Sequence, residues 1–396
     1  MSADHQVILL KGMQIYSEIG IVKNGYIKIV DQEIADIGPV KELKVENGWE
    51  IIDLPLNYKA VPGFIDLHIH GVDGADTMDA SPGALNTMAA ALPKEGTTSF
   101  LATTITHDIK HIENALENAG TYIQNSQYPA KAEILGIHLE GPFVNKKRAG
   151  AQPTQHIHDP DIKLFNKWQF LSTNKIKIVT MAPEQTGGLE MIRHFKETGV
   201  IASIGHSDAT FDEVREAVKE GASHVTHLFN GMSGLHHREP GVAGGAFLHD
   251  ELKTELIVDG IHVHPEVVKL AYKQKGSRGV ILITDSMRAK GMEDGEYDLG
   301  GQKVTVSDGK AVLGDGTLAG SILKMGAAVK NMMDFTGCSL EDVVEMASVN
   351  PAKQINLYRR KGSLSKGKDA DIVLLDENLD VVMTFCRGKL AYKKEE

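Results

Sequence analysis

Eight short apolar runs, separated by segments with helical periodicity, limit the folds available to this chain. They are residues 64–70, 98–105, 133–140, 176–182, 200–206, 223–229, 255–261 and 279–285. Runs without apolar–polar alternation predict parallel strands that are covered by helices on both faces. Eight strand–helix units in succession predict a (β/α)₈ TIM barrel. The alternative is an open doubly wound sheet, which the count of eight and the lack of a Gly-x-Gly-x-x-Gly turn after the first run weaken.

Capping signals and helical periodicity place helices between these runs. Thr210-Phe-Asp-Glu213 is a capping box that opens a helix. Asn350-Pro351 is expected to end the last helix, because a residue before proline avoids the helical region. The expected helices are 82–94, 107–121, 189–198, 211–220, 265–274, 321–336 and 340–347.

Both ends of the chain have a different character, with β-rich runs bounded by polar turns. Such runs predict strands rather than helices. We therefore expect a small β-sandwich domain formed by residues 1–60 together with 358–396, beside a barrel that spans 61–357. The runs are 7–10, 25–30, 33–38, 371–375, 381–385 and 389–392.

Composition excludes several classes of protein. The net charge of -11 argues against non-specific binding to nucleic acid or to a membrane surface. The only cysteines, Cys338 and Cys386, lie far apart, so we expect no disulfide framework and a reducing cytoplasmic location. We also expect neither a signal peptide nor a membrane span, because the chain lacks a basic leader and any apolar stretch of about 18 residues.

Histidines and carboxylates stand at the ends of the predicted barrel strands, where active sites of such barrels lie. His68 and His70 are two residues apart on one strand, so their rings point to the same face. A single histidine at a strand end is more often a packing or capping residue, but six ligand-type residues on one rim indicate a metal centre. They are His68, His70, Glu140, His206, His227 and Asp285.

This set predicts metal-assisted hydrolysis of a carbon–heteroatom bond. Imidazoles and carboxylates without thiolates suit Zn, Fe, Mn or Co. Six ligands exceed the need of one ion, which predicts two ions with Glu140 as a candidate bridge. Asp285 can contact a metal, accept a proton from water and then protonate a leaving nitrogen. His138 is a further ligand candidate, less favoured because the other residues already fill both shells.

Four loops near the rim are candidate substrate contacts. Residues 230–241 follow the sixth strand and contain Arg238, a forked donor suited to phosphate or carboxylate. His262 follows the seventh strand. The basic run within 145–151 is either a phosphate site or a solvated loop, and the loop is favoured. Residues 316–321 form either a loop that closes over a ligand or a simple turn.

These motifs resemble the amidohydrolase superfamily, as does the terminal segment 362–373. Several stretches are similar to the branch that acts on N-acetyl-D-glucosamine 6-phosphate, and this resemblance covers essentially the whole chain. It implies removal of acetate to give D-glucosamine 6-phosphate, in amino-sugar catabolism and cell-wall sugar recycling. The stretches are 138–143, 205–209, 226–232, 238–241, 259–262 and 316–321.

The resemblance also implies roles for individual residues. Asp285 would be the general base and then the general acid, and Glu140, His206 and His227 would hold one metal ion. Members with Gln and Asn in place of the first-strand histidines bind one ion, so the histidine pair here implies two per chain. Arg238 would reach the active site of the neighbouring subunit in a homodimer. The implied substrate contacts are Ala151, Asn230, Gly231, Arg238, His262, Leu318, Ala319 and Gly320.

Two positions depart from the pattern of the branch. Many members carry His where Ala151 stands and Ala where Gly231 stands, so the role of that histidine is not transferred.

Two alternatives to this function remain. Another amidohydrolase would act on a cyclic amide or an N-acetyl amino acid, but many of those use a carboxylated lysine on the fourth strand, which here ends in Met181-Ala-Pro183. A non-enzymatic scaffold would not need to retain Asp285 and the metal ligands.

Overall fold

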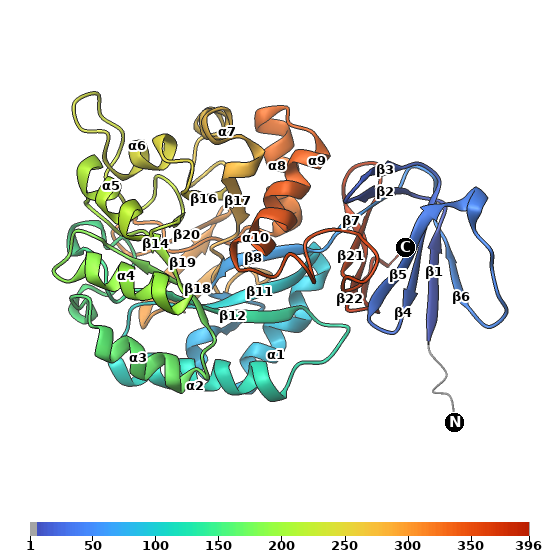
Figure 1. Cartoon of the computed structure of the whole chain (residues 1–396). Coiled ribbons are helices and arrows are strands. Elements are labelled where there is room, and N and C mark those ends of the chain that lie inside the picture. Colours follow the sequence, from blue (N-terminus) through green and yellow to red (C-terminus); the bar gives the residue numbers. More distant parts are fainter. Residues whose placement is uncertain (1–5, 396) are drawn as a thin grey trace.

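The predicted barrel is confirmed by a computed structural model that describes residues 6–395 (Figure 1). Residues 1–5 and 396, the outer ends of the predicted terminal segments, lie outside the described residues. Eight parallel strands follow one another in the order of the sequence. They are β8 Phe64–Ile69, β11 Thr97–Thr104, β12 Glu133–Glu140, β13 Ile176–Met181, β14 Ile201–Ile204, β15 His224–Val225, β16 Lys253–Ile257 and β17 Val280–Ile283.

The barrel closes between its last and first strands. Asp285 N donates to His68 O at 2.8 Å and His70 N donates to Ser286 O at 2.9 Å. These bonds lie at the carboxyl ends of β17 and β8, so the closure itself brings Asp285 beside the two histidines. The sixth strand is shorter than predicted: β15 ends at Val225, and His227 lies in the following turn with a positive φ of 31°.

Helices surround the barrel between the strands (Figure 1). They are α1 Pro82–Ala91, α2 Ile109–Asn125, α3 Ile162–Leu171, α4 Gly188–Thr198, α5 Phe211–Glu220, α6 Gly241–Leu248, α7 Pro265–Gly279 and α8 Met325–Thr336. The capping box of α5 forms as predicted. Sequence patterns missed α3 and α6, and α6 lacks an amphipathic period because six of its eight residues are buried. In residues 6–395 no helix combines the length and apolarity that a membrane span requires.

The predicted end of the last helix at Asn350-Pro351 is wrong. α9 Leu340–Val344 continues through a π-helical turn, Glu345–Val349, into α10 Asn350–Gln354. Pro351 is the second residue of α10 and directly follows the π-helical turn, where the regular i→i−4 hydrogen-bond pattern is already interrupted.

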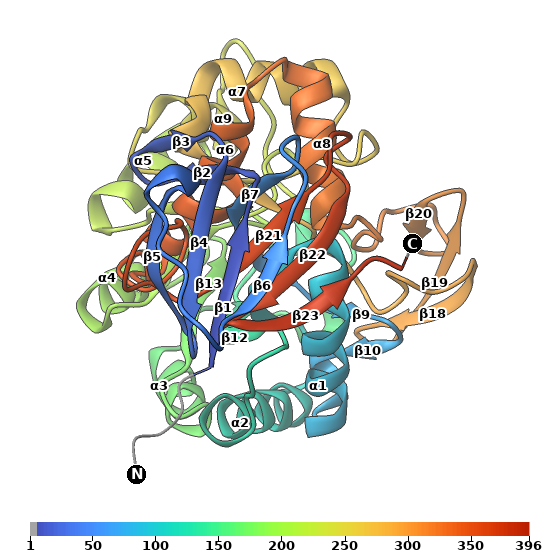
Figure 2. The ribbon, with the colours of Figure 1, turned by 90° about the vertical axis from the view of Figure 1, so that its right-hand side faces the viewer.

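Two further sheets lie beside the barrel, and strands from both ends of the chain share one of them (Figures 1 and 2). One sheet has the order β5-β4-β1-β6 and the other β23-β22-β21-β7-β2-β3, and side chains of both form a common apolar core. The domain boundaries at 60/61 and 357/358 stay a prediction. The strands are β1 Val7–Lys11, β2 Gln14–Ser17, β3 Gly20–Val22, β4 Gly25–Val30, β5 Glu33–Pro39, β6 Glu50–Asp53, β7 Lys59–Pro62, β21 Ile372–Leu375, β22 Val381–Cys386 and β23 Lys389–Lys393.

A three-stranded antiparallel sheet between β17 and α8 was not predicted. It consists of β18 Gly295–Leu299, β19 Gln302–Ser307 and β20 Lys310–Val312. Its apolar side chains pack against Ile105, Met287 and Ala319. This insertion therefore covers one side of the barrel's carboxyl end. A short hairpin, β9 Gly71–Val72 with β10 Ala75–Asp76, follows the first barrel strand.

Candidate active site

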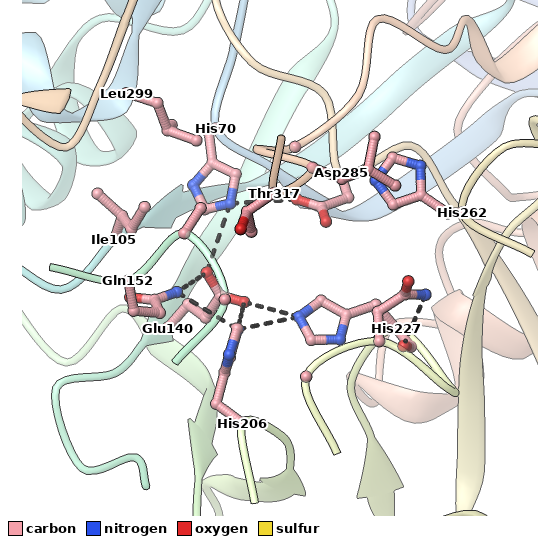
Figure 3. A pocket seen from close by; sticks show the side chains of 16 residues that line it. His70, Ile105, Glu140, Gln152, His206, His227, His262, Asp285, Leu299 and Thr317 are labelled. Atoms are coloured by element: carbon pink, nitrogen blue, oxygen red, sulfur yellow. Dashed lines mark hydrogen bonds and ion pairs between the residues drawn. The ribbon is translucent and has the colours of Figure 1, made fainter. Parts of the chain in front are cut away.

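A cavity opens at the carboxyl ends of the barrel strands, and its polar side chains converge (Figure 3). Its walls come from the loops after seven of the eight strands and from the β18–β20 insertion. The residues that line it are His70, Ile105, Glu140, Gly150, Ala151, Gln152, His206, His227, Asn230, Gly231, His262, Asp285, Leu299, Thr317, Leu318 and Gly320.

Glu140 is the centre of a first group of ligand-type side chains. Its Oε1 lies 3.2 Å from His206 Nε2 and 3.2 Å from His227 Nε2. The two Nε2 atoms are 3.1 Å apart. Donor atoms around a tetrahedral ion with bonds of ~2.0–2.1 Å are separated by ~3.3–3.4 Å. The three side chains can therefore hold one transition-metal ion with little movement.

A second group shares Glu140 with the first. Asp285 Oδ1 is 3.5 Å from His68 Nε2 and 3.3 Å from His70 Nε2. Glu140 Oε1 is 3.4 Å from His68 Nε2, and its Oε2 is 3.5 Å from His70 Nε2. One carboxylate thus faces both groups, as a bridging ligand would. His68 Nε2 is buried with no hydrogen-bond partner, which fits a nitrogen that serves as a metal ligand.

The charges of the cluster also indicate that it binds metal ions. Burial opposes protonation of His68, but Asp285, Glu255 and Glu140 outweigh it and raise its pKa to about 10. Burial also opposes ionisation of Glu140 and Asp285, yet the neighbouring imidazoles hold the pKa of both carboxyls below the usual range. The two carboxylates thus require positive charge beside them. Divalent cations supply that charge, and imidazole–carboxylate donors without thiolates suit transition metals.

Backbone conformation and hydrogen bonds hold these ligands in place. His206 Nδ1 donates to Arg148 O at 2.9 Å, which directs Nε2 toward Glu140. His206, His227 and Asp285 have positive φ angles of 47°, 31° and 48°. Such a backbone costs about 1–3 kcal/mol for a residue other than glycine and occurs in turns and at functional sites.

Comparisons with known proteins agree with this geometry. The pattern of the amidohydrolase family matches residues 60–391. The chain belongs to the amidohydrolase family. It is 51% identical over 390 residues to N-acetylglucosamine-6-phosphate deacetylase of Bacillus subtilis, covering 98% of each chain. It is 36% identical to N-acetylgalactosamine-6-phosphate deacetylase of Escherichia coli O157:H7, covering 97% of this chain and 99% of that one.

A solved structure extends the comparison to a complex. A mutant of N-acetyl-D-glucosamine-6-phosphate deacetylase from Mycobacterium smegmatis, in complex with N-acetyl-D-glucosamine-6-phosphate, has a TM-score of 0.90 to this chain. The two are 28% identical, and the match covers 99% of this chain and 100% of that one.

Most of the predicted substrate contacts of this amidohydrolase lie in the cavity, but two do not. Arg238 is exposed on the loop after β15, where its Nη1 lies 2.8 Å from His237 Nε2. Ala319 is fully buried against the β18–β20 insertion, between cavity residues on either side. The predicted contacts that line the cavity are Ala151, Asn230, Gly231, His262, Leu318 and Gly320.

Gln152 is the main cavity residue that the sequence did not reveal. Its Nε2 donates to Glu140 Oε2 at 2.7 Å, and its Oε1 accepts from Thr106 N at 2.9 Å. The amide therefore clamps Glu140 to the loop after β11. The only signal in the sequence was its place beside Ala151. Ile105, Gly150, Leu299 and Thr317 also line the cavity without having been predicted.

Two weaker candidates do not join the site. His138 is fully buried below the cavity, where Nδ1 donates to Leu67 O at 2.9 Å and Nε2 lies 2.7 Å from Thr180 Oγ1. Burial lowers its pKa to about 3, so the ring is neutral and both nitrogens are occupied. In the basic run, Arg148 Nε binds Asp208 Oδ1 at 2.8 Å near the surface, which favours a solvated loop.

Proposed function

We propose that this chain hydrolyses N-acetyl-D-glucosamine 6-phosphate to acetate and D-glucosamine 6-phosphate. The observation that carries the proposal is that Asp285 lines the barrel-end cavity and belongs to one of two adjoining imidazole–carboxylate groups. Support also comes from the Bacillus subtilis relative, which matches this chain over almost its whole length.

The proposal includes two divalent transition-metal ions per chain, Zn, Fe, Mn or Co. Glu140, His206 and His227 would hold one ion, while His68, His70 and Asp285 would hold the other; the Glu140 carboxylate lies within 3.5 Å of both His68 and His70. When bound, such ions polarise an amide carbonyl and lower the pKa of water towards neutrality.

Asp285 carries the proton through the reaction. Its pKa lies below the usual value despite burial, because His68 and His70 stabilise the carboxylate, so it is ionised at neutral pH. It accepts a proton as the water oxygen bonds to the acetyl carbon. It then donates this proton to the sugar nitrogen as the carbon–nitrogen bond breaks. Acetate and the amine leave, and Asp285 returns to its ionised form.

Substrate binding is assigned to the loops around the cavity. His262 Nδ1 pairs with Asp259 Oδ2 at 2.6 Å, which leaves Nε2 available to the sugar. Asn230, Gly231, Ala151, Leu318 and Gly320 line the same cavity, and we assign substrate contacts to them and to Ala319 between the last two.

We also propose a homodimer in which Arg238 binds the phosphate in the neighbouring active site. Two observations support this. Arg238 is exposed and does not line its own cavity, and Leu235 on the same loop is 60% exposed. The cytoplasm is the proposed location, since Cys338 and Cys386 are both unpaired.

A substrate comparison tests the proposal. Metal-replete protein is incubated with N-acetyl-D-glucosamine 6-phosphate, its galacto epimer, unphosphorylated N-acetyl-D-glucosamine and an N-acetyl amino acid. We expect acetate chiefly from the first compound and little from the unphosphorylated sugar. If the protein prefers the galacto epimer or the N-acetyl amino acid, the assigned substrate is wrong. If it releases acetate from none of the four compounds, the proposal is refuted.

A further inference from the structure

A buried carboxylate beneath the cavity contacts both ligand groups without belonging to either. Glu255 lies on β16, is fully buried and does not line the cavity. Ionised groups are buried only where partners replace their hydration. Three groups lie within hydrogen-bond distance of the Glu255 carboxylate: the rings of His68 and His224 and the backbone N–H of His227.

We infer that Glu255 is a positioning residue that presents His68 and His227 to the two proposed metal ions. Its Oε2 lies 2.9 Å from His68 Nδ1 and accepts a hydrogen bond from His227 N at 3.2 Å. One oxygen atom therefore contacts one ligand of each group. The inference rests on the proposed metal-dependent function.

The bond to His68 fixes which nitrogen of the ring can bind a metal. Because the carboxylate accepts, Nδ1 keeps its hydrogen, and Nε2 is the nitrogen that can release its proton and bind a metal. That Nε2 lies 3.4 Å from Glu140 Oε1 and has no partner of its own. Hydrogen bonds of this kind orient the ligand ring and make the other nitrogen a better donor, typically by 10–100-fold in metal affinity.

The hydrogen bond from His227 comes from its backbone N–H, so it stabilises the turn at this residue and not the orientation of its ring. β15 ends at Val225, and His227 then adopts the left-handed conformation that brings its Nε2 to 3.2 Å from Glu140 Oε1. Glu255 Oε2 accepts the N–H that this turn directs inward. His224 holds the other carboxylate oxygen, Oε1, at 3.0 Å, so the carboxylate cannot rotate away from the ligands.

A third ion between these residues is a weaker interpretation. His68, His138 and Glu255 lie close enough together to hold a cation. The ring of His138, however, already donates to Leu67 O and is paired with Thr180 through its second nitrogen. Glu255 therefore acts on the ligands rather than as a ligand.

Glu255→Gln tests this inference. The amide retains the size of the side chain, but only one of its two polar atoms can accept, so it cannot serve His68 and His224 as the carboxylate does. We expect the variant to bind the ion that depends on His68 about 10–100-fold more weakly. Metal ions per chain are counted by mass spectrometry after dialysis at defined free Co²⁺, and the Co²⁺ absorption spectrum reports the ligand geometry.

Glu133→Gln is the matched control, because Glu133 is also a buried carboxylate of the barrel but begins β12 at the end opposite to Glu140. It should bind Co²⁺ as the wild type does. If Glu255→Gln does not fold, His224→Gln, which frees only Oε1, should also weaken Co²⁺ binding. Wild-type Co²⁺ affinity and spectrum in the folded Glu255→Gln variant, or in His224→Gln, would overturn the inference.

The Co²⁺-binding test and the test of deacetylase activity can fail independently, because counting metal ions requires no substrate. Wild-type protein that binds Co²⁺ but leaves N-acetyl-D-glucosamine 6-phosphate intact would refute the deacetylase proposal, while the effect of Glu255→Gln on Co²⁺ would still decide the positioning role.

Discussion

Lys361→Met removes a buried positive charge that forms ion pairs with carboxylates of both the barrel and the terminal sheets. The Lys361 side chain is 1% exposed, and its Nζ lies 2.8 Å from Glu133 Oε2, 2.8 Å from Asp369 Oδ2 and 2.5 Å from Asp371 Oδ2. Glu133 begins barrel strand β12, whereas Asp371 immediately precedes β21 of the mixed sheet. Methionine has a similar size but leaves three carboxylates without their common cation.

The size of the effect follows from this burial. Removing one partner of a buried ion pair costs about 3–5 kcal/mol, because the remaining charge stays desolvated. Unfolding entropy of ~2.1 cal/mol/K per residue gives ~0.8 kcal/mol/K for 396 residues. For cooperative unfolding, the melting temperature should therefore fall by ~4–6 °C at pH 7.

The effect should depend on pH in a defined direction. Burial raises the pKa of Glu133, but Lys361 and Arg360 outweigh burial, so its pKa in the folded chain lies below the ordinary value of 4.5. A carboxyl with a lowered folded pKa contributes stability above its unfolded pKa and loses it as pH falls through the folded pKa. The difference between wild type and Lys361→Met should thus be complete at pH 7 and shrink below pH 4.5.

Scanning calorimetry at several pH values measures this difference. Lys303→Met is the control, because Lys303 pairs with Glu296 at 2.5 Å but is 67% exposed, and exposed pairs contribute less than about 1 kcal/mol. Adding Asp371→Asn to Lys361→Met should recover part of the loss, because it removes a buried carboxylate that has lost its ion pair with Lys361. A melting temperature of Lys361→Met equal to that of wild type at pH 7 would refute the reasoning.

Three further predictions concern the site. Asp285→Asn should fold normally and lose about 10²–10⁴-fold in kcat, because the amide cannot carry the proton; a near-wild-type rate in a deacetylation assay would contradict this role. Arg238→Ala should mainly raise KM for the phosphorylated sugar, and steady-state kinetics with an unchanged KM would exclude a phosphate contact. His68→Gln combined with His70→Asn should bind one metal ion fewer per chain than wild type; elemental analysis that finds no loss would exclude a second ion at this pair.

The barrel could be predicted because each of its strands is marked by a short apolar run of neighbouring residues. A fully buried parallel strand such as β17 is apolar on both faces, so its residues Val280–Ile283 stand out in the sequence. Helix α6 gave no such signal, because Gly241–Leu248 is buried nearly all round and has no polar face. The β18–β20 insertion was missed although β18 and β19 alternate between exposed and more buried residues, a pattern that predicts strands.

The site was predictable where a fold rule could be applied to strand ends. The carboxyl ends of barrel strands meet at one rim, so His68, His206 and Asp285 could be grouped without coordinates. Gln152 and Glu255 could not, because each acts through a partner that is distant in sequence. Gln152 reaches Glu140 across a loop, and Glu255 lies in the interior at a position that reads as an ordinary strand residue.

The most direct test of the proposed function joins metal binding to acetate release. Chelated protein is titrated with Co²⁺ or Zn²⁺ while acetate and D-glucosamine 6-phosphate are measured from N-acetyl-D-glucosamine 6-phosphate. We predict no acetate from metal-free protein, a rate that rises with bound metal until the cavity groups are filled, and equimolar amounts of both products. Metal-replete protein that leaves this substrate intact, or metal-free protein that acts at the full rate, would contradict the proposal.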